Sequence, residues 1–482
     1  MSAEPPSAER IARGLAGVEA LEIARAALAG GQEAWVVGGA PRDAALGIPV
    51  ADVDLAVAGD AREAARAIAA AADAHPFELS DEFATWRVVD RGGAWTLDVA
   101  RLRAATIEED LRLRDFTANA IALPLGGERE IDPTGGLADL RERRLRVVSE
   151  RSFSDDPLRI LRAARIAAAL GLEPEPETVE LARADARRAG EPAGERLFAE
   201  LAGMVSGPDP LAAVELLERL GGTPAVLPEL DALHGVSQSA NHHLDAHGHT
   251  IEVLRRVLEL EGDLEPYAGP VAPRVAELLA QPLADGLTRR DGLRFAALLH
   301  DVGKPVTRRE LPDGRVSFIG HDATGAEMNR GLCRRLRTSR RFADYLAAIT
   351  RDHLVLGFMV RERPLPPRRV WEYLRRCGRE SVDTTLLTIA DRLSAQGGGV
   401  PQAAIDGHLE LAREMLEAAA EWEREGPAPP LLRGDEIAAE AGIAPGPDLG
   451  EAVRELEAAQ FAGEVGDRED AIAHLRAWHR GR

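Results

Sequence analysis

Residues 34–57, AWVVGGAPRDAALGIPVADVDLAV, decide the fold of the N-terminal part of the chain. The run WVV is rich in β-forming residues and stops at Gly38-Gly39, which predicts a strand followed by a turn. Residues 52–57 alternate strictly between apolar residues and acidic or small ones, which predicts a half-buried strand. Helical runs and further strand-like runs follow, which predicts a small α/β domain with a partly buried sheet; these later strands are expected at 86–90 and 95–100.

The acidic residues of the second strand share one face. Residues two apart in a strand point the same way, so Asp52 and Asp54 lie together while the apolar residues beside them face the core. Two carboxylates held this close repel each other unless a divalent cation lies between them. Asp98, in the strand-like run 95–100, could supply a third ligand. The pattern favours metal-assisted attack at phosphorus, and the alternative is an edge strand with incidental acids.

The turn between these strands is glycine-rich. Gly38 and Gly39 precede a predicted helix, and Arg42 follows within its first turn. Glycines let a backbone approach a phosphate closely, and a helix N-terminus adds positive potential. The turn is therefore a candidate phosphate loop, although a Gly-Gly pair alone is more often an ordinary turn.

Residues 154–165, SDDPLRILRAAR, predict a helix that begins with Ser154 or Asp155 as its cap. Asp156 beside Arg159 would present a carboxylate acceptor next to a guanidinium donor, which selects the base edges of C and A over those of U and G. The alternative is a solvated helix face. Three arginines recur at every third position and form a ladder on one side of the helix: Arg159, Arg162 and Arg165.

Histidines and aspartates gather in the middle of the chain. His300-Asp301 ends an apolar run, and Lys304, the only lysine of the chain, follows three residues later. Imidazole and carboxylate ligands suit a divalent metal that activates water for phosphate-ester hydrolysis, whereas a lone histidine on a helix is more often a packed residue. The other members of the series lie before and after this pair: His242, His243, His247, His249, His321, His353 and Asp391.

Composition limits the class of protein. The 482 residues include 59 basic and 80 acidic ones, and the net charge of −21 argues against indiscriminate nucleic-acid coating while permitting a local basic site. Hydrophobic residues make up 45%, which is enough for packed cores in two to four domains. With two cysteines, no long apolar run and an acidic, proline-containing start, we expect a cytoplasmic protein without a signal peptide or membrane segment.

Breaks in the pattern divide the chain. Residues 1–30 predict a short amphipathic helix with a polar lead, and after Pro157 the pattern is almost wholly helical. Proline- and glycine-rich stretches at 221–235 and 426–430 mark further boundaries. We predict four parts: an α/β domain at 30–150, a helical region at 151–230, a histidine-containing domain at 236–400 and an acidic helical segment at 401–482.

Six segments resemble, in order, the motifs of the class II tRNA nucleotidyltransferase/poly(A) polymerase family: GGAPRD (38–43), DVD (52–54), LRDFTANA (113–120), DPTGGLADL (132–140), DDPLRILRAARI (155–166) and GERLFAEL (194–201). The resemblance implies that residues 30–150 are a polymerase-β-like nucleotidyltransferase head and that residues 151–230 are a helical neck and RNA-binding region, followed by an all-helical body, hence an α+β fold. It also implies that Asp52 and Asp54 are catalytic and bind Mg²⁺. The residues implied to contact the incoming nucleotide are Gly39, Arg42, Arg114, Asp156, Arg159, Arg162 and Arg165.

The histidine series resembles the signature of all-helical HD-domain phosphohydrolases over residues 242–395. Lys304 matches a lysine that often follows the His-Asp pair in that family. His321 and His353 match extra histidines of the versions that hold a second metal. The ligands implied for an unidentified divalent metal are His249, His300, Asp301 and Asp391.

Together the resemblances imply an enzyme that adds C and A residues from CTP and ATP to a tRNA or other RNA 3′ end, with an auxiliary HD phosphohydrolase. Only 15 residues separate Asp98 from Arg114, where relatives that add the terminal A usually carry a longer flexible loop, so a CC-only enzyme is one alternative. A poly(A) polymerase, an HD nucleotide phosphohydrolase with a degenerate head, and a non-catalytic RNA-binding protein are the others.

Overall fold

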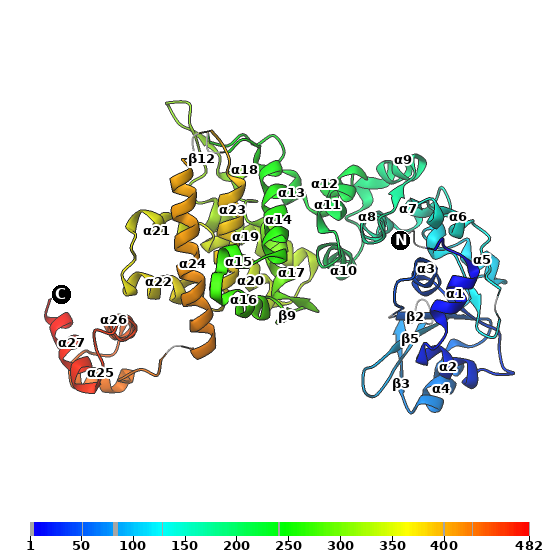
Figure 1. Cartoon of the computed structure of the whole chain (residues 1–482), viewed down its shortest axis with the longest axis horizontal. Coiled ribbons are helices and arrows are strands. Elements are labelled where there is room, and N and C mark those ends of the chain that lie inside the picture. The colour runs from blue at the N-terminus through cyan, green and yellow to red at the C-terminus, as the bar shows by residue number, and fades with distance from the viewer. Residues whose placement is uncertain are drawn as a thin grey trace. The chain divides into compact units, whose positions relative to one another are not determined.

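The chain forms two compact units in the computed structural model. The first holds residues 1–192 and 207–226, and the second holds residues 193–206 and 227–482. The first unit contains a six-stranded sheet with helices, and the second is almost wholly helical (Figure 1), so the α+β class is confirmed. The structure describes residues 4–50, 52–80, 85–127, 129–239, 242–398, 401–426 and 428–481.

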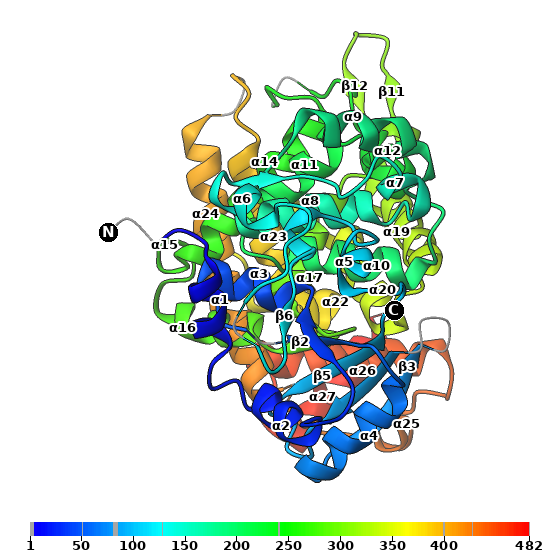
Figure 2. The ribbon, with the colours of Figure 1, turned by 90° about the vertical axis from the view of Figure 1, so that its right-hand side faces the viewer.

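The sheet of the first unit has the strand order β3-β4-β5-β2-β1-β6. β2 and β5 are parallel and lie side by side (Figure 2), whereas the other neighbouring strands are antiparallel. The strands expected at 52–57, 86–90 and 95–100 are confirmed to within one residue. The bounds are β1 (Ala34–Val37), β2 (Asp52–Val57), β3 (His75–Ser80), β4 (Thr85–Val89), β5 (Thr96–Arg101) and β6 (Leu123–Pro124).

Alternation along β2 places its two kinds of side chain on opposite faces. Val53, Leu55 and Val57 are at most 3% exposed and belong to the core. Ala56, on the face that carries the aspartates, packs in a cluster with residues of β1 and of α5 (Ile107–Leu111). The acidic end of this face is more open, since Asp52 is exposed.

Two expectations for helices are wrong. Residues 1–30 form two helices, α1 (Ala8–Leu15) and α2 (Glu19–Ala27), because the chain breaks at Gly17, whose φ is +75°. Neither Ser154 nor Asp155 caps the arginine helix, since both lie in the short α7 (Ser152–Asp155). The residue before a proline avoids the α region, so Asp156 is extended, and α8 (Arg159–Leu170) begins only after Pro157.

Further helices complete the first unit. α3 (Gly39–Leu46) follows β1 directly and contacts β2, which brings its N-terminus to the carboxylates of that strand. α11 (Pro210–Arg219) packs against α8 and supports the arginine helix from behind. The remaining long helices of this unit are α4 (Ala61–Ala72) and α9 (Pro176–Asp185).

A helical bundle forms most of the second unit. α14, α23 and α24 run side by side (Figure 1), and α17 packs against both α14 and α23. Within the described parts of the chain, the helices are all too short or too polar to cross a membrane. The helices that surround the candidate site are α14 (Ala246–Gly262), α17 (Arg289–Leu299), α19 (His321–Leu336), α20 (Arg340–Asp352), α23 (Ser381–Ser394) and α24 (Gln402–Glu425).

The C-terminal helices have a small core of their own. α25 (Gly434–Ala441), α26 (Pro447–Phe461) and α27 (Arg468–Arg480) enclose a cluster that includes Ile437 and Leu456, both at most 1% exposed. α26 also contacts α22 (Pro367–Cys377).

A buried ion cluster ties the bundle together. Arg289, 6% exposed at the start of α17, pairs with Asp383 of α23 and with Glu423 of α24, whose Oε2 lies 2.6 Å from Nη1. The hydroxyl of Tyr345, on α20, donates to Asp383 Oδ1 at 2.8 Å. Four helices therefore meet at one buried charge cluster, in which each group depends on its partners.

Asp383→Ala should destabilise the bundle by about 3–5 kcal/mol, because it leaves Arg289 without its fully buried partner. Urea unfolding of the helical transition, followed by circular dichroism, measures the loss. Glu421→Ala is the control, since it removes an ion pair with Arg424 whose side chains are 65% and 63% exposed, and such pairs contribute about 0–1 kcal/mol. Equal effects of the two substitutions would contradict a structural role for the cluster.

Candidate active sites in the head and the HD domain

The strand register of the sheet aligns three charged residues in one row. Asp54 of β2 lies opposite Asp98 of β5, and Asp98 lies opposite Arg87 of β4. Arg87 donates from Nε and Nη2 to the two oxygens of Asp98, both at 2.7 Å. Asp98, which the sequence offered as a third metal ligand, thus has both carboxylate oxygens bound to an arginine that the sequence analysis missed.

The aspartates of β2 form a crowded anionic site. Burial raises the pKa of Asp54, and the nearby charges of Asp98 and Asp52 raise it further, while Arg114 opposes them. Carboxylate oxygens are the donors that Mg²⁺ prefers, and a divalent cation would relieve this repulsion. The residues present therefore fit a metal held by Asp52 and Asp54.

The glycine turn lies directly against this site. Gly38 has φ +74° and ψ −130°, and a Cβ added to it would lie 2.7 Å from Oδ2 of Asp54 and 3.5 Å from Nη1 of Arg114. A Cβ on Gly39, the first residue of α3, would lie 3.3 Å from Nη2 of Arg42. The turn thus brings backbone N–H groups, the N-terminus of α3 and Arg114 close to Asp54, and Arg42 lies beside Gly39, an arrangement that suits phosphate binding.

A chain of hydrogen bonds joins this turn to the arginine helix. Arg42 donates from Nη1 to Oδ1 of Asn119 at 2.6 Å, and Asn119 donates from Nδ2 to Oδ1 of Asp115 at 2.9 Å. Arg162 of α8 donates from Nε to the other oxygen of Asp115 at 2.9 Å. Burial would raise the pKa of Asp115, but Arg162 and Asn119 hold it below its ordinary value. Asp115 is therefore an ionised link between the phosphate loop and α8.

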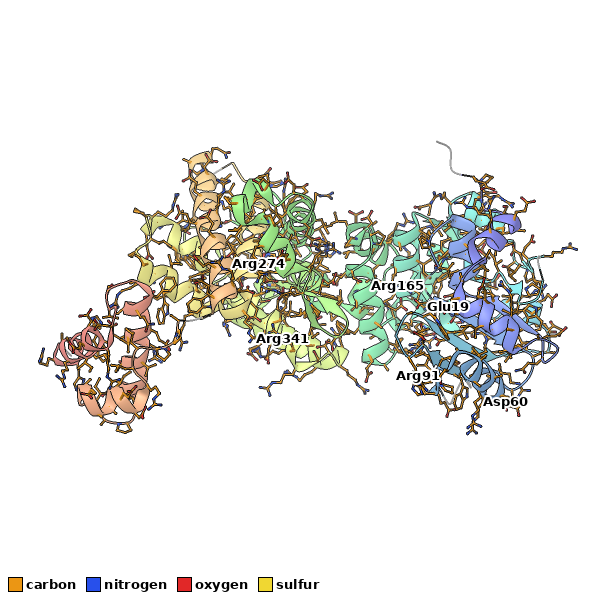
Figure 3. The ribbon with its side chains drawn as sticks, turned by 60° about the horizontal axis from the view of Figure 1, so that its bottom comes forward. Glu19, Asp60, Arg91, Arg165, Arg274 and Arg341 are labelled. Atoms are coloured by element: carbon orange, nitrogen blue, oxygen red, sulfur yellow. The ribbon has the colours of Figure 1, made fainter. Side chains whose placement is uncertain are left out.

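The other predicted nucleotide contacts lie near this link. Arg114 reaches Oδ2 of Asp110 at 3.3 Å. Arg159 donates to the carbonyl oxygens of Ser152 and Leu113, while Oδ1 of Asp156 accepts from the backbone N–H of Leu158. Figure 3 shows Arg165 on the same helix.

The second site lies where five helix ends of the bundle converge. Nε2 of His249 lies 2.9 Å from Oδ1 of Asp391 and 3.8 Å from Oδ2 of Asp301. The same Asp301 oxygen lies 3.1 Å from Nε2 of His300, and its other oxygen lies 3.4 Å from Nε2 of His321. Two groups of possible ligands share Asp301: His249, His300 and Asp301, and Asp301, His321 and His353.

The backbone fixes the orientation of three of these histidines. Nδ1 of His300, His321 and His353 each donates to the carbonyl oxygen three residues earlier, at 2.9, 2.8 and 2.6 Å. Their Nε2 atoms therefore carry the lone pair that faces the cluster. Nε2 of His300 and Nε2 of His321 are buried and form no hydrogen bond within the described part of the chain. Buried imidazole nitrogens with unused lone pairs, gathered around one carboxylate, fit one or two divalent metal ions.

A cavity of about 570 Å³ opens onto the cluster. Lys304, 6% exposed, reaches Oδ2 of Asp301 and Oε1 of Gln238, both at 2.5 Å, and lies over the ring of Phe318. His242 lines the cavity, whereas His243 is exposed and the ring of His247 stacks on that of His234, with centroids 3.7 Å apart. The structure thus brings together six of the predicted metal ligands and the single lysine, and leaves His243 and His247 outside.

Three family models match the chain in succession. Residues 34–146 match the poly(A) polymerase head domain, residues 171–233 match the probable RNA and SrmB binding site of polymerase A, and residues 246–396 match the HD domain. The chain is 38% identical to the A-adding tRNA nucleotidyltransferase of Deinococcus radiodurans over 92% of this chain and 95% of that protein. The chain belongs to the class II tRNA nucleotidyltransferase family.

Other members of this family agree over nearly the whole chain. The CC-adding tRNA nucleotidyltransferase of Thermus thermophilus is 33% identical over 94% of this chain and 95% of that protein. The fold also matches that of the Thermotoga maritima CCA-adding enzyme complexed with tRNA, with a TM-score of 0.60, 22% identity and 97% of each chain covered. The chain is thus a nucleotidyltransferase with an HD domain.

Asp115, Asn119 and Arg87 are the contacts of this nucleotidyltransferase that sequence reasoning missed. Asp115 and Asn119 stand in the motif LRDFTANA, so the motif located them, but ordinary loop and cap chemistry explained them equally well. No sequence motif marks Arg87, because its pairing with Asp98 depends on the register between β4 and β5.

Gly38→Ala should reduce nucleotidyl transfer about 100-fold, because the added methyl would displace the turn or Asp54, and misplacement of reacting groups by about 1 Å costs that much. Gly93→Ala is the matched control. Gly93 has φ +71° and a Cβ added there would meet nothing within 4 Å, so this substitution introduces backbone strain without a steric clash. Transfer rates of the two purified variants, with circular dichroism to show that both fold, decide the question. Equal losses in both variants would contradict the close approach.

Proposed function

We propose that the head transfers CMP or AMP from CTP or ATP to the 3′ end of a tRNA and releases pyrophosphate. The observation that carries this proposal is the hydrogen-bonded chain from Arg42 through Asn119 and Asp115 to Arg162, which connects a phosphate loop beside paired carboxylates to a helix that can read a base. Such a connection lets the fit of the base set the position of the triphosphate.

Each residue has a defined task in this reaction. Asp52 and Asp54 would hold Mg²⁺, which activates the attacking 3′-hydroxyl and neutralises charge on the leaving pyrophosphate. The Gly38-Gly39 turn and Arg42 bind the triphosphate, and Arg114, beside Asp54, neutralises part of its charge. On α8, Asp156 and Arg159 read the base, with Arg162 and Arg165 behind them on the ladder.

The connection after β5 supports addition of only part of CCA. Five residues, 102–106, join β5 to α5, and they are held by Arg103, which donates to Asp110, and by a capping box between Thr106 and Glu109. A connection this short and this well bonded leaves no room for the longer loop that relatives which add the terminal A usually carry. CC addition fits this expectation, and A addition is the second candidate because of the similarity to the A-adding enzyme.

The HD domain is proposed to be an auxiliary phosphohydrolase. His249, His300, Asp301 and Asp391 would hold a divalent metal, His321 and His353 would complete a second site around Asp301, and a metal there supplies an activated water. Lys304 pairs with Oδ2 of Asp301 and lines the cavity, where its ammonium group can bind a phosphate oxygen. Phosphate esters of RNA ends, including cyclic phosphates, are the substrate class that suits this site.

The nucleotide specificity can be tested with three tRNA substrates, which lack CCA, end in CC or carry the complete CCA. Each is incubated with the protein, CTP and ATP. We expect addition of CC without A, or of A to the CC-ending tRNA without any C, as read by sequencing of the products. Complete CCA addition would contradict the partial-addition proposal. Full activity of Asp52→Ala would contradict the catalytic role of the head.

His300→Ala and Asp301→Ala should each reduce hydrolysis of a nucleoside 2′,3′-cyclic phosphate about 100-fold. Mutation of a residue that only hydrogen-bonds to a metal ligand lowers activity by up to about 100-fold, and loss of the ligand itself should lower it at least as much. Nucleotidyl transfer should stay unchanged. His243→Ala serves as the control, because His243 is exposed and lies outside the cluster. Loss of both activities in either ligand variant would show that the sites are not independent.

A further inference from the structure

Arg87 and Asp98 are two charged residues beside the carboxylate site of the head to which the proposed reaction gives no role. They lie in one row with Asp54 across three neighbouring strands, β2, β5 and β4. Their side chains are 37% and 19% exposed, so the pair is accessible at the edge of the carboxylate site. The charges of Asp52 and Asp54 also act on Arg87, and with its hydrogen bonds to Asp98 they raise its pKa.

The pair has a geometry that competes with metal binding by Asp98. Both oxygens of Asp98 accept hydrogen bonds from Arg87, so one lone pair on each oxygen is occupied and the charge of the carboxylate is already neutralised, which weakens Asp98 as a metal ligand. Two parallel charge-assisted bonds at 2.7 Å are the strongest form of such a pair. For Nη1 of Arg87, by contrast, the described residues supply no hydrogen bond or ion pair, so this nitrogen can bind a ligand.

Strand order determines which ligand can reach Arg87. The order β3-β4-β5-β2-β1-β6 places the glycine turn after β1 on one side of the β2 carboxylates and Arg87 on the other. In phosphoryl transfer the attacking and leaving oxygens lie in line on opposite sides of phosphorus. If the triphosphate lies at the glycine turn, the attacking RNA end must arrive from the β5–β4 side.

We propose that Arg87, held by Asp98, binds the phosphate next to the 3′ end of the accepting RNA and so positions its terminal hydroxyl. Asp98 is then a positioning residue and not a metal ligand. A guanidinium fits this task because its fork can bind a carboxylate on one edge and a phosphate on another. The inference rests on the proposed function of the head and assigns its acceptor side.

A metal-binding experiment distinguishes whether Asp98 is a metal ligand or a residue that positions Arg87. Mn²⁺ binding to the full chain, followed by the electron paramagnetic resonance of free Mn²⁺, should weaken strongly in Asp54→Asn and stay within about twofold in Asp98→Asn. Equal weakening in both variants would make Asp98 a ligand and overturn the proposal. Unchanged binding and unchanged transfer in Asp54→Asn would instead refute the proposed function of the head.

Steady-state kinetics test the role of Arg87. Arg87→Ala should raise the KM for tRNA about tenfold, the effect of losing roughly one charge-assisted contact, and leave the KM for the nucleotide unchanged. The dependence of log tRNA affinity on log salt should become shallower by about 0.7, as expected for one phosphate contact on a single strand. Arg87→Lys keeps the charge and should recover part of the affinity.

Arg91→Ala is the matched control, because Arg91 lies in the turn between β4 and β5 (Figure 3) and pairs with Asp73 at the surface. It should change neither KM. A rise in the KM for the nucleotide alone in Arg87→Ala would place Arg87 on the triphosphate side, and an unchanged KM for tRNA would remove it from the acceptor side. Either result would overturn the proposal.

Discussion

Repulsion between carboxylates on one face of the head sheet is the constraint on which the rest of this domain depends. Asp54 lies between Asp52 on its own strand and Asp98 on the next; burial raises its pKa, and the charges of these two carboxylates raise it further. The neighbouring structure supplies compensation from two directions. Arg114 approaches from the glycine turn, where the absence of a side chain at Gly38 leaves room, and Arg87 approaches from β4. The remaining negative charge is what a divalent cation can neutralise, so the site is poised for metal without being saturated by arginine.

Asp115 is a second buried carboxylate whose charge is compensated by neighbours, and it also couples the positions of these neighbours. It is 7% exposed, and its two oxygens bind Asn119 on one side and Arg162 on the other. A buried carboxylate that loses one partner pays the full desolvation cost, so the positions of Arg162 and Asn119 are coupled through it. Because Asn119 also accepts a hydrogen bond from Arg42, a shift of α8 would change the position of Arg42 beside the glycine turn.

Local patterns in the sequence were sufficient where the cause is local. The alternation of residues 52–57 located β2 and the shared face of its aspartates, and the His-Asp pair at 300–301 located the cluster of histidines and aspartates. The sequence could not show that Arg87 takes both oxygens of Asp98, because that contact depends on the pairing of β4 with β5. The start of α8 was misplaced because the effect of Pro157 on the preceding residue outweighs the capping preference of Ser154 and Asp155.

The HD cluster shows why one lysine remains in a chain whose other basic residues are arginines. His300 and His353 are the C-cap residues of α17 and α20, and their Nδ1 atoms bind carbonyl oxygens that the ending helices leave without partners. The resulting Nε2 atoms crowd around Asp301, so little space is left for a cation that must also touch this carboxylate. A compact ammonium group fits there, 2.5 Å from Asp301 and from Gln238, whereas the wide planar fork of a guanidinium would have to displace one of the histidines around this carboxylate. The single lysine of the chain therefore stands where the geometry of the histidine–aspartate cluster favours a compact cation.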